Sequence, residues 1–178
     1  MKSFSAKSTL TKWSGNYPVF IFVGLFALQI ILFYIIYLNP WMQDKVFTHL
    51  VNLYAELSAK LLHLIGQQTS ISGDIIFSNQ FSVEIKKGCD AIEPMALFIA
   101  GINAFPASVR KKLTGLLFGL VILFLLNIMR IVMLFLTGIY NRSLFEAMHV
   151  EIWQMIFILV AIAIWFLWLR WTMHKSRK

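Results

Sequence analysis

The apolar run LTGLLFGLVILFLLNIMRIVMLFLTGIY, residues 113–140, decides the fold class of this chain. A helix needs about 20 such residues to cross a hydrocarbon core of about 30 Å, and this run is longer. Two further runs, residues 18–38 and 150–171, also meet that length. Of the 178 residues, 59% are hydrophobic and 13% are charged, which is far from the composition of a soluble domain. The sequence therefore predicts an all-α integral membrane bundle.

A fourth apolar run, residues 90–105, is shorter. It spans the membrane if Cys89 and Asp90 lie at one interface and residues 106–108 at the other, with local thinning of the bilayer. The first run, residues 18–38, is too long for a signal-peptide core and is expected to be a retained anchor. We therefore predict about four transmembrane helices in a single membrane domain, residues 1–178.

Basic residues orient the predicted bundle. They cluster in residues 1–17, 106–112 and 172–178, beside the ends of the apolar runs. By the positive-inside rule these segments are a cytoplasmic tail, a cytoplasmic loop and a second cytoplasmic tail, so both termini lie inside. The formal charge of +8 therefore reflects topology, and the expected partner is the lipid bilayer rather than a nucleic acid.

Residues 46–66 have the pattern of an amphipathic helix. Five polar residues recur at steps of three and four and form one stripe: His49, Asn52, Glu56, Lys60 and His63. Two arrangements fit, a helix lying in the outer interface and a spanning helix whose stripe faces the bundle. Because a spanning helix would move the basic loop 106–112 outside, the positive-inside rule favours the outer interfacial helix.

Residues 71–87 have a pattern typical of β-strands. Residues 71–77 are rich in β-branched side chains, residues 81–86 alternate between apolar and polar, and the Ser-Asn-Gln at 78–80 is typical of a turn. We therefore predict a small outer β-hairpin that delivers the chain to Gly88 and Cys89.

Cys89 is the only cysteine of the chain. This count excludes an internal disulfide, a two-cysteine redox motif and a paired-cysteine zinc site, and we predict no metal or cofactor. A helix is expected from about Ala91, with Asp90 as N-cap and Glu93 completing a capping box. Its dipole favours a thiolate, while the two acidic side chains oppose one. The alternative role of Cys89 is that of a small apolar filler.

Arg130 lies inside the run 113–140, about 25 Å from its inner end at 1.5 Å per residue. A guanidinium among aliphatic side chains is costly unless it faces protein or water. Asn127 is one turn earlier on the same face, and we expect it to hold Arg130 by hydrogen bonding. The alternative is that Arg130 snorkels to the outer headgroups.

His149 opens the last apolar run and shares a membrane level with Cys89 and Arg130 in the predicted topology. Histidine acts as an acid or base near neutral pH, and the alternative is an interfacial histidine without a chemical role. A cysteine nucleophile, a histidine base and an arginine that stabilises negative charge form a set suited to acyl transfer.

Three elements in this order resemble the exosortase/archaeosortase family. They are GCDAI at residues 88–92, NIMRI at residues 127–131 and the histidine that opens the next helix, and the resemblance covers about residues 81–171. It implies a cysteine transpeptidase or protease of the plasma (inner) membrane, with its active site on the outer, periplasmic face. Cys89 would be the nucleophile, Arg130 the stabiliser and His149 the base.

The resemblance also implies partners. Substrates would be membrane-anchored exported proteins with a C-terminal sorting tag, which is a short motif followed by one transmembrane helix and a basic tail. The short chain looks most like the exosortase H branch, whose tag is expected to differ from Pro-Glu-Pro. A surface amine is a possible acceptor. We expect four further residues to support the site or to contact substrate, with helix capping the preferred role of the two acids: Gly88, Asp90, Glu93 and Asn127.

The alternative function is that of a non-enzymatic membrane subunit or assembly factor. Arg130 would then pack helices or bind lipid headgroups, and residues 46–66 would dock a partner. The two hypotheses differ in what they expect of Cys89→Ala. This substitution stops an enzyme and leaves an assembly factor intact.

Overall fold

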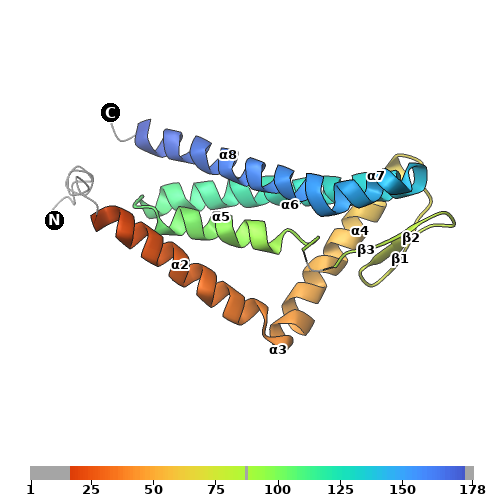
Figure 1. The fold of residues 1–178 in the computed structure, drawn as a ribbon, viewed down its shortest axis with the longest axis horizontal. Helices are drawn as coiled ribbons and strands as arrows, with labels where there is room; N and C mark the ends of the chain where they lie inside the picture. Colours follow the sequence, from red (N-terminus) through yellow and green to blue (C-terminus); the bar gives the residue numbers. More distant parts are fainter. Residues whose placement is uncertain (1–16, 87, 175–178) are drawn as a thin grey trace.

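A computed structural model describes residues 17–86 and 88–174 of the chain, and Figure 1 shows its ribbon. In chain order the elements are α2 (Tyr17–Tyr37), α3 (Pro40–Met42), the π-helical segment η2 (Gln43–Phe47), α4 (Thr48–Leu64), β1 (Ser70–Ser72), β2 (Ile75–Phe77), β3 (Ser82–Glu84), α5 (Ile92–Ala104), α6 (Val109–Tyr140), α7 (Arg142–Ala147), the π-helical segment η3 (Met148–Ile152) and α8 (Trp153–His174). This arrangement confirms an all-α membrane bundle with a small sheet. The predicted tails, residues 1–17 and 172–178, lie largely outside the described residues.

Three helices of the described chain, α2, α6 and α8, are long and apolar enough to cross a membrane. The described residues therefore contain one helix of spanning length fewer than predicted, and the shorter one is α5, which runs back from the far end of α2 to the end where α6 begins, as Figure 1 shows. This helix has 13 residues, which corresponds to about 20 Å against a core of about 30 Å. It ends at Ala104 because Phe105 precedes a proline and is extended, with φ −75° and ψ 138°.

Helix α6 is the longest helix in the described part of the chain. Its 32 residues make it about 48 Å long, well beyond the thickness of a hydrocarbon core. Helix α5 packs on its first half, α8 runs along both halves, and the second half also meets α4 and the sheet, as Figure 1 shows. Arg130 lies in the second half. One core therefore lies among the spans and a second one forms between α6, α4 and the strands.

Helix α4 is amphipathic, as predicted. Its buried residues form one face that packs on α6 and the sheet: Tyr54, Ala55, Ser58, Ala59 and Leu62. The polar stripe lies on the other side, where His49, Glu56, Lys60 and His63 are exposed and Asn52 is partly buried. The arrangement in which this stripe faces the bundle is therefore wrong. The apolar face of α4 is thus buried on protein, and the outer interfacial position of this helix stays a prediction.

The predicted hairpin is a three-stranded antiparallel sheet in the order β1-β2-β3. The difference comes from a second turn inside the run 71–77. Gly73 adopts φ +62°, a conformation open to glycine at little cost, so the chain reverses there and Ser72 pairs with Ile75. The predicted turn at 78–80 also forms, with the Ser78 N–H donating to the Phe81 carbonyl at 2.8 Å.

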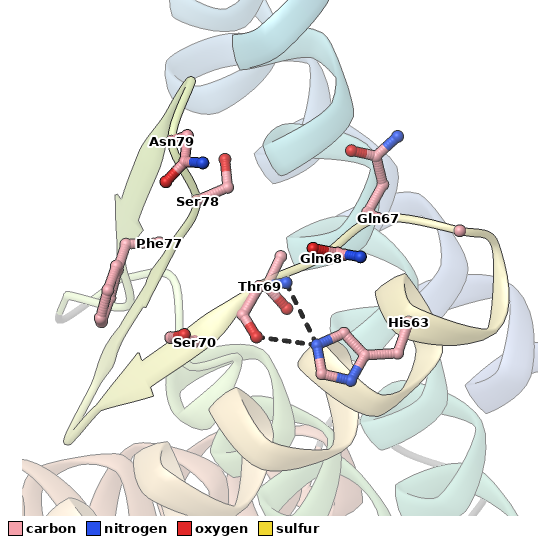
Figure 2. Close-up of a pocket in the computed structure, with 9 residues that line it drawn as sticks. His63, Gln67, Gln68, Thr69, Ser70, Phe77, Ser78 and Asn79 are labelled. Carbon is pink, nitrogen blue, oxygen red and sulfur yellow. Dashed lines mark hydrogen bonds between the residues drawn. The ribbon is translucent and has the colours of Figure 1, made fainter.

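A polar pocket of about 530 Å³ lies between the end of α4 and the sheet, and Figure 2 shows it. The His63 ring points toward the pocket, and its Nε2 lies 3.1 Å from the Thr69 backbone nitrogen and 2.8 Å from the Thr69 carbonyl oxygen. Cys89, Arg130 and His149 are not among its lining residues. The pocket is therefore separate from the predicted reactive side chains.

The contact between α5 and α6 predicts a large effect of a single methyl group. A Cβ on Gly119 would lie 2.1 Å from the Phe98 Cζ, whereas a Cβ on Gly24 of α2 would meet nothing within 4 Å. We expect Gly119→Ala to destabilise the protein by about 1–3 kcal/mol, because the buried Phe98 ring must move. Thermal unfolding in detergent micelles measures the change. Gly24→Ala is the matched control, and equal melting temperatures for the two variants would contradict the predicted packing.

Candidate active site

The Cys89 loop connects β3 to α5 and contains two left-handed residues. Gly88 has φ +86° and Ala91 has φ +56°, so the chain turns sharply on both sides of Cys89 and Asp90. The Cys89 N–H donates to the Lys86 carbonyl at 2.9 Å and closes the first turn. A non-glycine residue with positive φ is strained, and such strain is typical of functional loops. The loop presents the Cys89 side chain toward α6 and η3.

The start of α5 differs from the prediction in its register. The N-cap is Ala91, which makes no side-chain capping bond, and helical residues begin at Ile92. The Asp90 Oδ1 accepts from the Ile92 N–H at 3.2 Å. Asp90 therefore caps the helix, although it stands one residue before the N-cap position.

The two acidic residues of this region connect the site to α2. The Tyr37 hydroxyl donates to Asp90 Oδ2 at 3.4 Å, and the Tyr34 hydroxyl donates to Glu93 Oε1 at 3.3 Å. Glu93 therefore contacts a neighbouring helix instead of completing a capping box. Sequence patterns did not point to these tyrosines, because a tyrosine at the end of an apolar span is ordinary.

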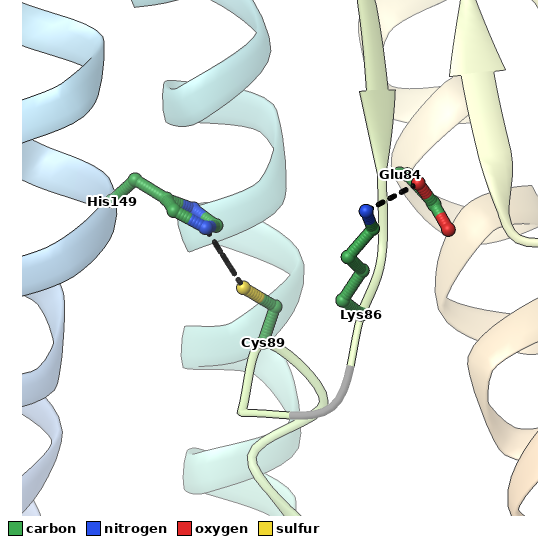
Figure 3. Close-up of polar contacts among 4 residues, drawn as sticks. All are labelled: Glu84, Lys86, Cys89 and His149. Carbon is green, nitrogen blue, oxygen red and sulfur yellow. Dashed lines mark hydrogen bonds and ion pairs between the residues drawn. The ribbon is translucent and has the colours of Figure 1, made fainter.

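His149 lies next to the thiol, as Figure 3 shows. The Cys89 Sγ is 3.7 Å from His149 Nδ1 and 3.7 Å from His149 Nε2. Phe145 stacks on the imidazole with ring centroids 5.5 Å apart and an interplanar angle of 11°. The π-helical segment η3 carries His149 at the entrance to α8. Stacking fixes the plane of the ring, so either ring nitrogen is held near the sulfur.

Arg130 reaches the same point from α6. Its Nη2 donates to the Cys89 Sγ at 3.6 Å and to the His149 carbonyl at 3.5 Å, while its Nη1 donates to the Gly88 carbonyl at 3.2 Å. The guanidinium carbon lies 5.7 Å from the centre of the Phe157 ring. Arg130 is only 4% exposed, so its charge is inside the protein and does not reach outward as a snorkelling arginine would.

Asn127 behaves differently from the prediction. Its side chain is fully buried, but neither its oxygen nor its nitrogen has a hydrogen-bond partner among the described residues. The Arg130 Nε also lacks a partner there. The expected direct hydrogen bond between the two side chains is therefore not formed.

Burial controls the protonation of the reactive pair. It raises the pKa of the Cys89 thiol, where the positive charge of Arg130 acts in the opposite direction and the negative charge of Asp90 adds to the rise. Burial and then the charge of Arg130 both lower the pKa of the His149 imidazole. The resting site therefore favours a neutral thiol beside a neutral imidazole. The thiolate expected from the helix dipole is outweighed by desolvation.

The structure thus brings together Cys89, Arg130 and His149, which come from a loop and two helices far apart in the sequence. A thiol, a neutral base and a fixed cation at one point suit nucleophilic attack on a carbonyl carbon. The two rings that hold the site, Phe145 and Phe157, were not among the predicted residues. Phe145 precedes His149 by one helical turn, which is the signal that would have identified it.

Comparison with known proteins identifies the family of the chain. A family model described as transmembrane exosortase matches residues 19–167. No curated protein and no solved structure matches the chain. The matched range includes the spans of α2 and α6, the first 15 residues of α8 (residues 153–167) and all three reactive residues. Because the match extends over most of its length, the chain belongs to the transmembrane exosortase family.

Proposed function

We propose that this protein is a membrane-embedded cysteine peptidase or transpeptidase that cleaves the C-terminal sorting signal of exported proteins at the outer face of the membrane. Membership of the exosortase family supports a membrane transpeptidase or protease role in general. The observation that carries the specific proposal is the contact of the Cys89 sulfur with both His149 and Arg130, at 3.7 Å and 3.6 Å.

The first step forms a thioester. His149 takes the proton of the Cys89 thiol as the sulfur attacks the substrate carbonyl carbon. The reaction therefore starts from the neutral thiol and the neutral imidazole and needs no preformed thiolate–imidazolium pair. The carbonyl oxygen becomes an oxyanion, which the guanidinium of Arg130 stabilises beside the sulfur. When the C–N bond breaks, the imidazolium returns its proton to the leaving amine. The N-terminal part of the substrate is then attached to Cys89 as a thioester.

The second step releases this acyl group. His149, neutral again, takes a proton from an incoming nucleophile, which attacks the thioester carbon and displaces the Cys89 sulfur. Water as the nucleophile gives a cleaved protein, and an amine gives a new amide that joins the protein to a surface acceptor. The sulfur leaves with the proton that the imidazolium supplies, which restores the resting pair.

The two ends of the bundle support an outer active site. Lys111 and Lys112 lie at the beginning of α6, and the Lys111 Nζ donates to the Thr172 carbonyl near the end of α8 at 2.8 Å. Arg110 and Arg170 belong to the same end of these helices. Basic residues mark the cytoplasmic side of a membrane protein, and the Cys89 loop lies toward the other end of α6. This arrangement favours a cytoplasmic basic end and an outer reactive end.

The proposal is tested with purified components. The wild-type protein is reconstituted in vesicles with a substrate that carries a tag, one transmembrane helix and a basic tail. We expect cleavage without any other protein, and product mass distinguishes hydrolysis from transfer to an added amine. A substrate without the transmembrane helix is the matched control and is cleaved more slowly, because the membrane no longer positions it. Processing in cells but none with purified components would favour the assembly-factor alternative.

The pKa shifts predict the pH dependence of processing. His149 must be neutral to accept the thiol proton, and its pKa is lowered by burial and by Arg130. The rate is therefore retained as the pH falls through the ordinary histidine pKa of about 6.5 and is lost only at lower pH. Initial rates in vesicles across pH 4–9, with the thermal stability of the protein followed in parallel, measure the midpoint. A midpoint above about 6.5 would contradict a neutral His149 base.

A further inference from the structure

Strand β3 forms one edge of the sheet and leads directly to the reactive cysteine. In the order β1-β2-β3 it pairs with β2 on one side, and among the described residues no strand pairs with its other side. The chain continues from Glu84, the last residue of β3, through Lys86 to Cys89. Figure 3 shows Glu84 and Lys86 on this segment. The candidate active site is therefore the continuation of an edge strand.

The pairing register shows which backbone groups of β3 face outward. The Phe81 carbonyl accepts a bond of 2.8 Å and the Ile85 N–H donates a bond of 3.0 Å, both on the side of β2. Because successive residues of an antiparallel strand bond to opposite sides, Ser82 and Glu84 face away from β2. The Lys86 N–H donates to the Glu84 carbonyl at 3.1 Å. The outward groups that β3 leaves for another chain are the Ser82 N–H, the Ser82 carbonyl and the Glu84 N–H.

The sheet is attached to the bundle by its apolar face. Val83 and Ile85 are buried in the core that the sheet shares with α4 and α6, whereas Ser82, Glu84 and Lys86 are exposed. The Lys86 Nζ lies 3.0 Å from the Glu84 Oε2, and this ion pair is on the surface, with 68% and 44% of the two side chains exposed. An exposed strand edge is a template on which another extended chain can pair.

We propose that the edge of β3 binds the substrate, whose residues before the cleaved bond pair with it as an extended strand. Strand addition recognises a peptide through its main chain. Under the proposed function, on which this inference rests, the substrate runs from an outer domain into its transmembrane helix. Strand β3 runs in the same direction, toward Cys89 and the start of α5, as Figure 1 shows. The added strand is therefore parallel to β3 and carries the cleaved bond toward Cys89.

Parallel pairing makes one substrate residue the main anchor. In a parallel ladder, a residue opposite the space between two outward residues bonds to both of them. Its N–H donates to the Ser82 carbonyl, and its own carbonyl accepts from the Glu84 N–H. The N–H groups of its two neighbours in the substrate point away from β3. One backbone N–H of the substrate therefore contributes to binding at this edge, and the N–H groups on either side of it do not.

Glu84→Pro tests the edge from the side of the enzyme. Proline has no N–H and is accepted where the N–H of an edge strand faces outward. Ile71→Pro is the matched control on the opposite edge, because its partner Ile76 bonds toward β3 and the Ile71 N–H faces away from the sheet. The binding partner is a fluorescent form of the substrate with a tag, one transmembrane helix and a basic tail. Its affinity for the inactive Cys89→Ala protein is measured in detergent micelles by fluorescence anisotropy.

We expect Glu84→Pro to weaken this affinity about tenfold, the effect of losing one hydrogen bond, and Ile71→Pro to leave it unchanged. Glu84→Ala removes the carboxylate but keeps the N–H, so we expect it to bind the substrate more tightly than Glu84→Pro does. Melting temperatures of all variants are measured in parallel. Unchanged affinity in Glu84→Pro would overturn the inference, and so would an equal loss in Glu84→Ala, which would assign binding to the carboxylate.

A modified substrate gives a second measurement that needs no change in the sheet. Substrates with a single N-methylated residue at each successive position of the tag are bound to Cys89→Ala. We expect one position at which methylation weakens binding about tenfold, while methylation of both neighbours has no effect. A series without such a position would overturn strand pairing, even if Glu84→Pro failed to fold.

These experiments separate this inference from the proposed function. No binding of the substrate to Cys89→Ala would reject the proposed function and this inference with it. Binding that Glu84→Pro leaves unchanged would reject only the strand pairing. A wild-type dimer that Glu84→Pro converts to a monomer, with substrate affinity unchanged, would show that the edge of β3 pairs with a second copy of the chain and would also overturn the inference.

Discussion

Cys89→Ala abolishes processing of the natural substrate, with a rate reduced by about 10⁴-fold or more. The substitution removes the atom that forms the thioester, and the described residues contain no second thiol to replace it. Cys89→Ser keeps the size of the side chain, but its hydroxyl is far harder to deprotonate than a thiol, so this variant is also inactive. The measurement is the fraction of co-expressed substrate converted per unit time at equal enzyme abundance.

The same two variants also provide the control for an effect on packing. Cys89 is buried, and the serine variant preserves its volume, so a shared loss of activity with an unchanged melting temperature is a chemical effect. If Cys89→Ala processed the substrate at the wild-type rate, the nucleophile assignment would be wrong and the assembly-factor alternative would lead.

Arg130→Ala lowers kcat by about 10²- to 10³-fold, the usual effect of losing an oxyanion stabiliser. It also removes the donor to the Gly88 carbonyl, so the Cys89 loop loses a support at 3.2 Å. Arg130→Lys keeps the charge but lacks the planar fork that reaches Gly88, Cys89 and His149 together. We therefore expect the lysine variant to fall between alanine and wild type. Separate kcat and KM values for the processing reaction are measured.

Arg142→Ala is the matched control for this prediction. Arg142 is an exposed arginine in α7, a short distance along the chain from Arg130, and we expect its replacement to leave kcat unchanged. Wild-type kcat in both Arg130→Lys and Arg130→Ala would contradict a role for this cation in the chemistry.

Much of the fold is predictable from sequence because membrane spans depend on length and polarity alone. Apolar runs identify α2, α6 and α8, and polar residues at helical spacing identify α4. The sheet was predicted with one turn too few. The turn within residues 71–77 is hard to recognise in the sequence, because Gly73 and Asp74 stand among β-branched residues. The backbone geometry of the structure shows that the chain reverses there.

The residues of the candidate site could be predicted from the sequence, but the contacts among them could not. Cys89, Arg130 and His149 were predicted from residue type and membrane level, but their contact depends on how each helix is rotated. Rotation is set by close packing, such as Gly119 against Phe98, and an almost uniformly apolar span carries little periodic signal. For the same reason the Asn127 side chain was expected to hold Arg130 by a direct hydrogen bond, which the structure does not form.

The central claim is a covalent acyl group on Cys89, and one measurement tests it most directly. Reconstituted protein is mixed with substrate, quenched in acid and digested, and the mass of the peptide that contains Cys89 is determined. We predict a transient adduct of the N-terminal substrate fragment on Cys89 that hydroxylamine removes. An adduct on another residue, together with continued cleavage by Cys89→Ala, would contradict the account.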